Sequence, residues 1–401
     1  MSAAAHPSRR CDIFCTVIDN FGDAGVCWRL AKQLAAEYGW TVRLWIDVPT
    51  LLERLGAQPL ASAHGTFSDG VEILSWQHRP QADHSLVDGL DYQRPFSARP
   101  AEVVIEAFGC TLPASYIAAM CAAPPLWLNL EYLSAEPWVA DLHLLASPHS
   151  RLPLRKTFFF PGLRAGTGGV LKEADFDVRQ QAFTGNPDAV RAFWHTLGVA
   201  THLMDEPSIA ISLFAYDNPA LDPLLIAWRE GAENVRLFVP EGLISRRIAA
   251  FFGVETLAAG TSARAGRLIA YGLPFVDQSR YDQLLSLCDV NLVRGEDSFV
   301  RAQLCRKPFA WHIYPQEDGA HQLKLDAMLD CYTAALPAAT QAATRRFWHA
   351  WNGIGDAAPD WADWWRHRSA LERLAHAWAE QLERLGHLAG NLVEFCETRL
   401  K

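Results

Sequence analysis

Two acidic residues four positions apart, Asp19 and Asp23, stand where an apolar run gives way to a helical pattern. Open α/β sheets bind ligands at the carboxyl ends of their strands, beside helix starts. At such a place one carboxylate can orient a substrate while the other accepts a proton. The pair therefore indicates acid–base chemistry. A helix cap and a solvated acid account for the same two residues.

The residues between these acids, Asn20, Phe21 and Gly22, form a turn that leads into the helix at Gly25. Gly22 permits a tight turn and close approach of a ligand, and the first N–H groups of a helix favour a negative partner. The spacing Gly22-x-x-Gly25 lacks the full dinucleotide fingerprint. It gives little support to an oxidoreductase of the Rossmann type.

A second cluster, Arg294 to Ser298, has the same placement after a later apolar run. Arg294 offers a forked donor to phosphate, Ser298 and the helix start can bind phosphate oxygens, and Gly295 lets the backbone approach. Glu296 and Asp297 repel a bare phosphate, so they indicate a sugar hydroxyl, a cationic group or a capping role. Asp297 or Ser298 as an ordinary helix N-cap is the structural alternative.

Aromatic and amide side chains are expected at the same sheet edge as Arg294. Phe214 and Tyr216 follow one strand pattern, while Phe275 and Gln278 connect a later strand to a helix. An aromatic ring can stack on a nucleobase, and a glutamine amide can pair with the edge of a pyrimidine. Core packing is the alternative for Phe214 and Phe275.

Other catalytic motifs find little support. Asp175-Phe176-Asp177 has the D-x-D form of metal-dependent sugar transferases, but it does not follow an apolar strand, so it is interpreted as solvated acids. The sequence contains no H-E-x-x-H, no nucleophile elbow and no P-loop. We therefore expect neither a metal site nor a cofactor.

The elements that position these clusters alternate between short apolar strands and helices in two stretches of the chain. Strands are expected at Cys11–Asp19, Thr41–Asp47, Val71–Trp76, Val103–Phe108, Leu126–Tyr132, Ser208–Phe214, Val235–Val239, Arg267–Ala270, Val290–Val293 and Pro308–Ile313. Helices are expected from Gly25 to Tyr38 and from near Pro49, Pro219, Leu243, Gln278 and Ser298. This alternation predicts two α/β units with mostly parallel sheets.

The predicted domain organisation follows from where the alternation stops and restarts. The first α/β domain is expected at residues 1–160 and the second at 207–370. A glycine-rich stretch with weak strand signal, 161–206, is predicted to connect them. Leucines at three-or-four spacing predict an amphipathic helix at 371–401, which is expected to pack back on the first domain.

Composition excludes several classes of protein. The chain has 401 residues, 50% of them hydrophobic, and a net charge of -9, so no global positive field exists to hold nucleic acid or an anionic membrane. No apolar run reaches the roughly 18 to 20 residues of a membrane-spanning helix. Nine scattered cysteines are typical of reduced thiols. We therefore expect a globular cytoplasmic protein.

Several longer strings resemble one known family. They are Cys11–Cys15, Val17–Asp23, Val26–Ala31, Leu213–Tyr216, Leu273–Gln278, Asn291–Phe299, Ala302–Gln303 and Pro308–Trp311. In this order they are similar to the bacterial protein-arginine rhamnosyltransferases that modify elongation factor P, the EarP family. The strings cover both halves of the chain.

The resemblance implies a GT-B glycosyltransferase with two facing Rossmann-like domains, an acceptor-binding amino half and a donor-binding carboxyl half. The implied donor is dTDP-β-L-rhamnose, a substrate rather than a cofactor. The implied acceptor is an arginine side chain of elongation factor P, and the product has the inverted anomeric configuration. A guanidinium has a pKa above about 12 and becomes a nucleophile only when a carboxylate orients it and takes a proton.

The same resemblance implies roles for individual residues. Asp23 is expected to be the general base, Glu296 a second essential carboxylate, and Asp19 a residue that supports acceptor binding. The residues expected to hold the nucleotide and diphosphate are Tyr216, Phe275, Gln278, Arg294, Asp297 and Ser298. Those expected to approach the sugar are Asn20, Phe21 and Gly22.

Two alternatives stay open at this point. One is a GT-B transferase with another nucleotide sugar or another acceptor, because the residues do not distinguish thymine from uracil or one sugar from another. The other is a noncatalytic nucleotide-sugar-binding protein, against which the acidic pair Asp19 and Asp23 argues.

Overall fold

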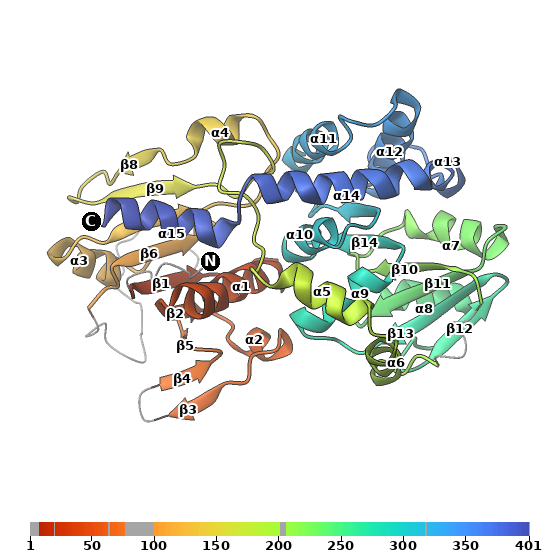
Figure 1. Cartoon of the computed structure of the whole chain (residues 1–401), viewed down its shortest axis with the longest axis horizontal. Helices are drawn as coiled ribbons and strands as arrows, with labels where there is room; N and C mark the ends of the chain where they lie inside the picture. The colour runs from red at the N-terminus through yellow and green to blue at the C-terminus, as the bar shows by residue number, and fades with distance from the viewer. Residues whose placement is uncertain are drawn as a thin grey trace. The chain divides into compact units, whose positions relative to one another are not determined.

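The computed structural model describes residues 8–19, 21–62, 65–76, 99–200, 206–316 and 319–400. The chain forms two compact units. Unit 1 comprises Met1–Ala174 and Leu385–Lys401, and unit 2 comprises Asp175–Arg384. Each unit contains its own largely parallel sheet with helices packed against it (Figure 1).

The sheet of unit 1 has nine strands among the described residues. Their order across the sheet is β3 (Leu60–Ser62), β4 (Gly65–Ser68), β5 (Val71–Ser75), β2 (Thr41–Ile46), β1 (Arg10–Cys15), β6 (Val103–Ala107), β7 (Leu126–Leu130), β9 (Arg155–Phe159) and β8 (Ala146–Pro148). The six strands from β5 to β9 pair in parallel, whereas β3, β4 and β8 are antiparallel additions at the two edges.

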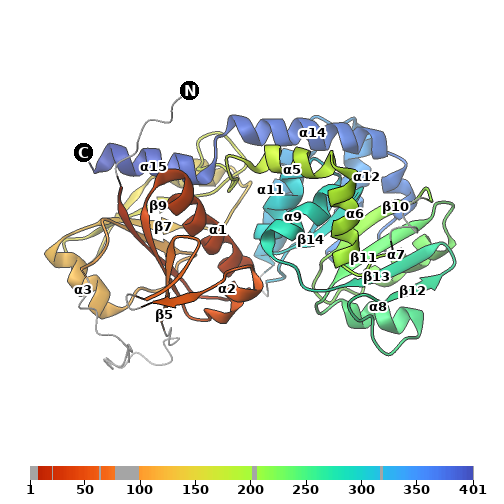
Figure 2. The ribbon, with the colours of Figure 1, turned by 60° about the horizontal axis from the view of Figure 1, so that its bottom comes forward.

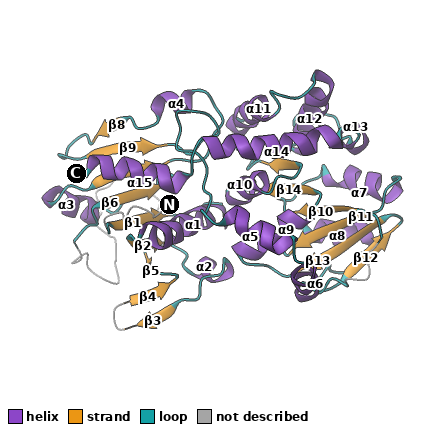
Figure 3. Cartoon of the chain, viewed as in Figure 1, coloured by secondary structure: helices purple, strands orange, loops and turns teal. Residues whose placement is uncertain are grey.

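Helices cover both faces of this sheet, as Figure 3 shows. They are α1 (Phe21–Tyr38), α2 (Thr50–Arg54), α3 (Ala114–Ala122), α4 (Trp138–Leu142) and α15 (Leu388–Arg399). Alternate side chains of β1 point to opposite faces. Ile13 packs in a core with Leu30 of α1 and Leu392 of α15, whereas Phe14 packs with Tyr116 of α3 in a separate core.

The sheet of unit 2 has six strands in the part of the chain that the structure describes. Their order is β12 (Ser262–Ala265), β13 (Leu268–Leu273), β11 (Val235–Pro240), β10 (Ile209–Leu213), β14 (Val290–Arg294) and β15 (Phe309–His312). All neighbouring pairs are parallel except β12 with β13. Figure 2 shows β10, β11 and β13 running side by side.

The helices of unit 2 bury large aromatic side chains. They are α5 (Phe176–Thr184), α6 (Pro187–Thr196), α7 (Leu221–Glu230), α8 (Ser245–Phe252), α9 (Gln278–Leu287), α10 (Asp297–Leu304), α11 (Ala320–Tyr332), α12 (Ala338–Trp351), α13 (Trp361–Trp365) and α14 (Arg368–Arg384). Trp361 of α13 packs edge-on against Trp228 of α7, with ring centroids 5.4 Å apart. Trp364 stacks on Phe347 of α12 at 4.4 Å.

All ten strands predicted from the sequence are present, and their parallel pairing confirms the α/β fold class. β3, β4, β8, β9 and β12 were not predicted. Four of them are short antiparallel edge strands with weak apolar patterns. β9 begins with Arg155 and Lys156, whose charges interrupt the apolar pattern that identifies a strand.

The boundary between the two units, at Ala174 and Asp175, lies within the predicted connection 161–206, and the described residues on either side of it belong to one unit or the other. Residues before α5 belong to unit 1, where Val170 forms a β-bridge with His387. The helices α5 and α6 belong to unit 2, where Trp194 stacks on Phe238 at 4.5 Å. The weak strand pattern in this stretch therefore reflects a change from strands to packed loops and helices. The segment before α5 packs in unit 1, and the segment from α5 onward packs in unit 2.

The single C-terminal helix predicted at 371–401 is two helices, α14 and α15. The break contains Gly386, whose φ of +78° is a left-handed conformation that favours glycine. α14 belongs to unit 2, and α15 packs in the core of unit 1. The expected packing on the first domain is therefore confirmed for the last helix alone.

Candidate active site

The first cluster of predicted site residues lies in unit 1, in the loop that follows β1 and in the first turn of α1. The loop lies at the carboxyl edge of the parallel sheet because β1 ends at Cys15. Asp23 is 2% exposed, and its Oδ2 accepts hydrogen bonds from the backbone N–H of Ile18 (2.8 Å) and Asp19 (2.9 Å). These bonds cap the chain before the helix and also fix the orientation of the carboxylate, so the structural and chemical interpretations of Asp23 are compatible.

The surroundings of Asp23 make it a stronger base than a solvated aspartate. Burial is the main cause that raises the pKa of its carboxyl group above the ordinary value, and the charge of Asp19 raises it further. The two backbone N–H groups and the hydroxyl of Tyr132 act in the opposite direction. The net pKa is raised, which brings the group closer to the operating range of a general base.

Gly22 gives the Asp19 side chain the space that it occupies. The N–H of Gly22 donates to the carbonyl oxygen of Asp19 at 2.7 Å, and a Cβ at Gly22 would stand 3.1 Å from the Asp19 Oδ2. The neighbouring Phe21 ring lies 5.3 Å from the guanidinium carbon of Arg54. The structure therefore gathers Asp19, Phe21, Gly22 and Asp23 where this loop enters α1. Asn20 lies outside the described residues.

Two aromatic residues that the sequence analysis did not assign to the site lie at the same sheet edge. The hydroxyl of Tyr132 donates to the Oδ1 of Asp23 at 3.1 Å, and its ring stacks on Phe108 with centroids 4.3 Å apart. Tyr132 and Phe108 each follow the end of a parallel strand, β7 and β6 respectively. That position was a signal that could have identified them.

The second cluster lies in unit 2, where the ends of β10 and β14 are neighbours in the sheet. Arg294, the last residue of β14, is 7% exposed. Its guanidinium carbon lies 4.6 Å from the ring centroid of Phe214 and 4.4 Å from that of Tyr216. Aromatic rings beside a planar guanidinium restrict its orientation. The structure thus brings three predicted donor-site residues together.

The start of α10 supplies the backbone part of this cluster. Gly295 has a φ of +67°, and its carbonyl oxygen accepts a hydrogen bond from the Trp311 indole at 3.1 Å. The N-cap of α10 is Glu296, with no side-chain capping bond, so the N-cap alternative for Asp297 or Ser298 is wrong. These two residues open the helix, where N–H groups and the helix dipole favour an anion.

Gln278 is connected directly to this helix start. It is the first residue of α9, 4% exposed, and its Nε2 donates to the Asp297 Oδ2 at 3.1 Å. Phe275 lies half-buried in the loop between β13 and α9. The predicted residues from two successive strand ends therefore meet at α9 and α10, with Phe275 in the loop that leads into α9.

His312 and Tyr314 are further residues at this edge that the sequence did not single out. His312 ends β15, opposite Arg294 in the strand register, and its ring lies 5.2 Å from that of Tyr216. Tyr314 contacts Tyr216 at 5.5 Å. Burial, together with the charge of Arg294, lowers the pKa of His312 to about 4. The imidazole is therefore neutral near pH 7. Among His312, Tyr216 and Arg294, the positive charge is on Arg294.

The acids of the D-x-D sequence are engaged in ion pairs. Asp175 lies 2.9 Å from Arg179, and Asp177 lies 3.7 Å from Arg306. Within the described ranges, no three His, Cys, Asp or Glu side chains are grouped as a metal ion requires. Absence of a metal requirement is still a prediction, to be tested by chelation.

Two further findings concern the chain outside these clusters. No helix in the described ranges is long and apolar enough to cross a lipid bilayer. All nine cysteines lie in described segments and are free thiols.

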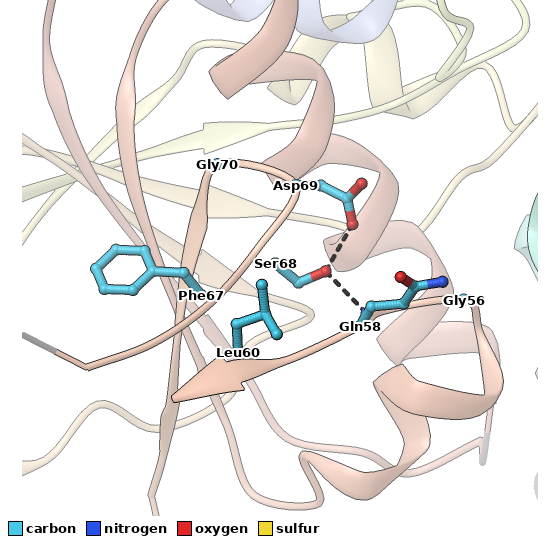
Figure 4. A pocket seen from close by; sticks show the side chains of 7 residues that line it. All are labelled: Gly56, Gln58, Leu60, Phe67, Ser68, Asp69 and Gly70. Carbon is cyan, nitrogen blue, oxygen red and sulfur yellow. Dashed lines mark hydrogen bonds between the residues drawn. The ribbon is translucent and has the colours of Figure 1, made fainter. Parts of the chain in front are cut away.

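A cavity of about 500 Å³ in unit 1 is formed by residues other than those of the two clusters (Figure 4). It is lined by residues between Gly56 and Gly70. The Ser68 hydroxyl donates to the Asp69 Oδ2 at 2.7 Å and accepts from the Gln58 N–H at 3.0 Å. These polar groups form hydrogen bonds with one another, and we assign no function to the cavity.

Two known proteins that share one name are similar to this chain over nearly its whole length. The protein-arginine rhamnosyltransferase of Pseudomonas aeruginosa is 44% identical over 386 residues, which cover 96% of this chain and 98% of that protein. The protein of the same name from Neisseria meningitidis serogroup B is 34% identical over 381 residues, with 93% of each chain covered.

Solved structures extend the comparison to the fold. One, described as the structural basis for EarP-mediated arginine glycosylation of translation elongation factor EF-P, has a TM-score of 0.67 at 30% identity and covers 98% of this chain and 99% of that chain. MurG of Acinetobacter baumannii, at 12% identity, has a TM-score of 0.52, covers 98% and 100%, and shows the likeness of fold alone. The fold is of the GT-B glycosyltransferase type.

The last comparison is with protein families. Residues 11–397 match the family described as Elongation-Factor P (EF-P) rhamnosyltransferase EarP, so both clusters lie inside the matched range. The chain therefore belongs to the EarP family of glycosyltransferases.

Proposed function

We propose that this chain transfers L-rhamnose from dTDP-β-L-rhamnose to an arginine side chain of translation elongation factor P, with inversion at the anomeric carbon. Its family and its relatives are named for rhamnosyl transfer to protein arginine. A bacterial translation factor is present in the cytoplasm, so the activity is placed there. These names support the rhamnosyl group and the protein-arginine acceptor, the donor nucleotide and the inversion are part of the proposal, and the two clusters supply its chemistry.

The observation that carries the proposal is the state of Asp23. An arginine acceptor is protonated and becomes nucleophilic only when a carboxylate orients its N–H groups and accepts a proton. Asp23 is buried, its carboxylate is held by hydrogen bonds, and its pKa is raised above the ordinary value. Asp19, next to Gly22, adds a second negative charge that favours a cationic acceptor.

The donor half is proposed to lie at the second cluster. Arg294 and the first N–H groups of α10 would stabilise the negative charge that builds on the departing diphosphate. Phe275 and Gln278 would hold the base, and Glu296 is proposed as a second carboxylate essential for transfer. A metal ion has no step in this scheme.

The bond changes of the proposed reaction balance without a co-reactant. A terminal nitrogen of the arginine attacks C1 of rhamnose, and the bond between C1 and the β-phosphate oxygen breaks. Asp23 takes a proton from the attacking nitrogen, and dTDP leaves with the electron pair. A single displacement of this kind inverts the configuration, so a β-linked donor gives an α-linked product.

Peptide mapping with stereochemical analysis tests this proposal. Elongation factor P is incubated with the protein and dTDP-β-L-rhamnose, digested, and fragmented in a mass spectrometer to locate the modified side chain. NMR of the modified peptide gives the anomeric configuration. We expect one modified arginine with an α-linked rhamnose.

Control reactions with other nucleotide sugars test the specificity for the donor. Parallel reactions contain UDP-glucose or dTDP-glucose in place of the rhamnose donor. Equal transfer from these donors, or a modified residue other than arginine, would contradict the proposed substrates. A β-linked product would contradict the single displacement.

A further inference from the structure

The two oxygens of the Asp23 carboxylate have different partners. Oδ2 accepts two backbone hydrogen bonds, from Ile18 at 2.8 Å and from Asp19 at 2.9 Å. Oδ1 accepts the hydroxyl of Tyr132 at 3.1 Å. A carboxylate oxygen has about two lone-pair sites, so the two backbone bonds use the capacity of Oδ2. Oδ1 is therefore the oxygen suited to receive a proton from an acceptor.

The ring of Tyr132 is held in place by Phe108. The two rings are stacked, with centroids 4.3 Å apart and an angle of 14° between their planes. Phe108 has a φ of +57°, a strained left-handed conformation that is rare for a bulky residue. Its N–H donates to the carbonyl oxygen of Leu130 at 2.7 Å. The strained backbone is thus fixed to the last residue of β7, close in sequence to Tyr132.

Three adjacent strands contribute these groups to one sheet edge. The strands β1, β6 and β7 are neighbours in the sheet: Phe108 and Tyr132 follow the ends of β6 and β7, and Asp23 lies in the first turn of α1, the helix that follows β1. The stack is therefore built from neighbouring strand ends, which are rigid parts of the fold. Rigid elements hold a functional group more closely than long loops do.

We propose that Tyr132, supported by Phe108, is a positioning residue that aims the Oδ1 of Asp23 at the acceptor. The inference rests on the proposed function, in which Asp23 is the base. The hydroxyl of Tyr132 donates one hydrogen bond to Oδ1 and leaves a lone pair of that oxygen for an N–H of the substrate.

The charges around Asp23 determine the direction of the pH effect. Burial and the charge of Asp19 raise the pKa of Asp23, while the backbone N–H groups and Tyr132 lower it. The thiol of Cys15 also lies nearby and is protonated near pH 7, because its hydrogen bond with Cys27 and its burial raise its pKa well above the ordinary value. Loss of the Tyr132 hydroxyl therefore raises the pKa of Asp23 further.

The test is a pair of variants with two readouts. Tyr132→Phe removes the hydroxyl and keeps the ring, and we expect kcat to fall about 3-fold to 10-fold, the size of one hydrogen bond. The acid limb of the profile of kcat/KM against pH should move to higher pH. Phe108→Leu should lower kcat in the same direction. Binding of dTDP should be unchanged in both variants.

A double-mutant cycle separates positioning from general damage. In an Asp23→Asn background, Tyr132→Phe should have no further effect on the residual rate, because its target is gone. Tyr116→Phe is the matched control, since it removes another tyrosine hydroxyl that donates to a buried carboxylate, Asp12. This control should lower stability and leave the acid limb in place.

An NMR titration tests the role of Tyr132 without an activity assay. NMR titration of 13C-labelled aspartate should show a higher pKa for Asp23 in the Tyr132→Phe protein than in the wild type. An unchanged Asp23 pKa, or an equal cost of Tyr132→Phe with and without the Asp23 carboxylate, overturns the positioning role. Full activity of Asp23→Asn overturns instead the base assignment in the proposed function.

Discussion

Replacement of Asp23 by asparagine removes one proton acceptor and changes little else in the turn. An asparagine Oδ1 can accept the same two N–H groups, from Ile18 and Asp19, that the carboxylate accepts. Its amide group can donate to the hydroxyl oxygen of Tyr132, which then turns its own proton elsewhere. The turn between β1 and α1 therefore keeps its hydrogen bonds while the base is lost.

The expected cost to the reaction is large. Loss of a general base lowers the rate by about 100-fold to 10,000-fold. At about 1.36 kcal/mol for each factor of ten, this is roughly 2.7 to 5.4 kcal/mol of transition-state stabilisation. Binding of dTDP should be unchanged, because the donor is proposed to bind the residues of unit 2.

The stability of Asp23→Asn follows from the sign of the pKa shift. The pKa of Asp23 is higher in the folded protein than in the unfolded chain, mainly because burial disfavours the charge. Its contribution to stability is therefore present at low pH and is lost as the pH rises through the folded pKa. At pH 7 the asparagine variant should have a Tm equal to or above that of the wild type, and this advantage should shrink as the pH falls.

Transfer to elongation factor P and the Tm are measured on the same protein samples. Calorimetry with dTDP checks the donor site, and Asp69→Asn, an acid in a β-turn of unit 1, is a control for loss of a negative charge. Wild-type turnover by a folded Asp23→Asn protein would refute the assignment of the base. A marked decrease in Tm at pH 7 would contradict the conclusion that burial of the charged Asp23 carboxylate destabilises the folded protein.

Four further predictions follow from the two clusters. Phe275→Ala and Gln278→Ala should weaken dTDP binding in calorimetry, by about 1 to 3 kcal/mol for the lost stacking of Phe275, whereas Asp19→Ala should spare dTDP and impair use of the acceptor. Arg294→Lys keeps the charge but loses the forked donor, so the Kd for dTDP should rise about tenfold, and an unchanged Kd would contradict the phosphate contact. Saturating EDTA should not slow transfer, and rescue of an EDTA-treated sample by one divalent ion would reveal a metal site. Arg301→Met removes the guanidinium that is ion-paired with the fully buried carboxylate of Asp282, so urea denaturation should show a loss of about 3 to 5 kcal/mol in the free energy of unfolding.

The sheet and its edge could be predicted from the sequence because both depend on local patterns. Buried parallel strands such as β1 and β10 are nearly continuous apolar runs, and the turns after them contain the polar residues that bind ligands. Arg294 ends such a run, and Asp23 lies in the first turn of the helix that follows another. Their placement at the carboxyl edges of two sheets needed no knowledge of distant contacts.

The tertiary partners of these residues could not be predicted in the same way. Tyr132 meets Asp23 only because β7 lies beside β6 and β6 beside β1. A tyrosine at the end of an apolar run has the same pattern whether it packs in a core or faces a ligand. The contact of Arg294 with the rings of Phe214 and Tyr216 likewise depends on the pairing of β10 with β14.

The predicted helix boundaries differ from the observed ones where a single side chain or a single backbone angle determines where a helix begins or ends. The helix expected from Gly25 begins at Phe21, because Asp23 satisfies the N–H groups of the preceding residues. The break between α14 and α15 occurs at Gly386, inside a leucine pattern that continues across it. The spacing of the leucines predicts an apolar helical face, but it does not predict that α15 packs in the core of unit 1.

The intact mass of elongation factor P tests the central claim most directly. Purified elongation factor P is incubated with dTDP-β-L-rhamnose and a catalytic amount of this protein, and its mass is measured over time. We predict that nearly every molecule gains the mass of one rhamnosyl group, and that the Asp23→Asn protein leaves the mass unchanged on the same time scale. An unchanged mass with wild-type protein, folded acceptor and intact donor would contradict the proposed activity.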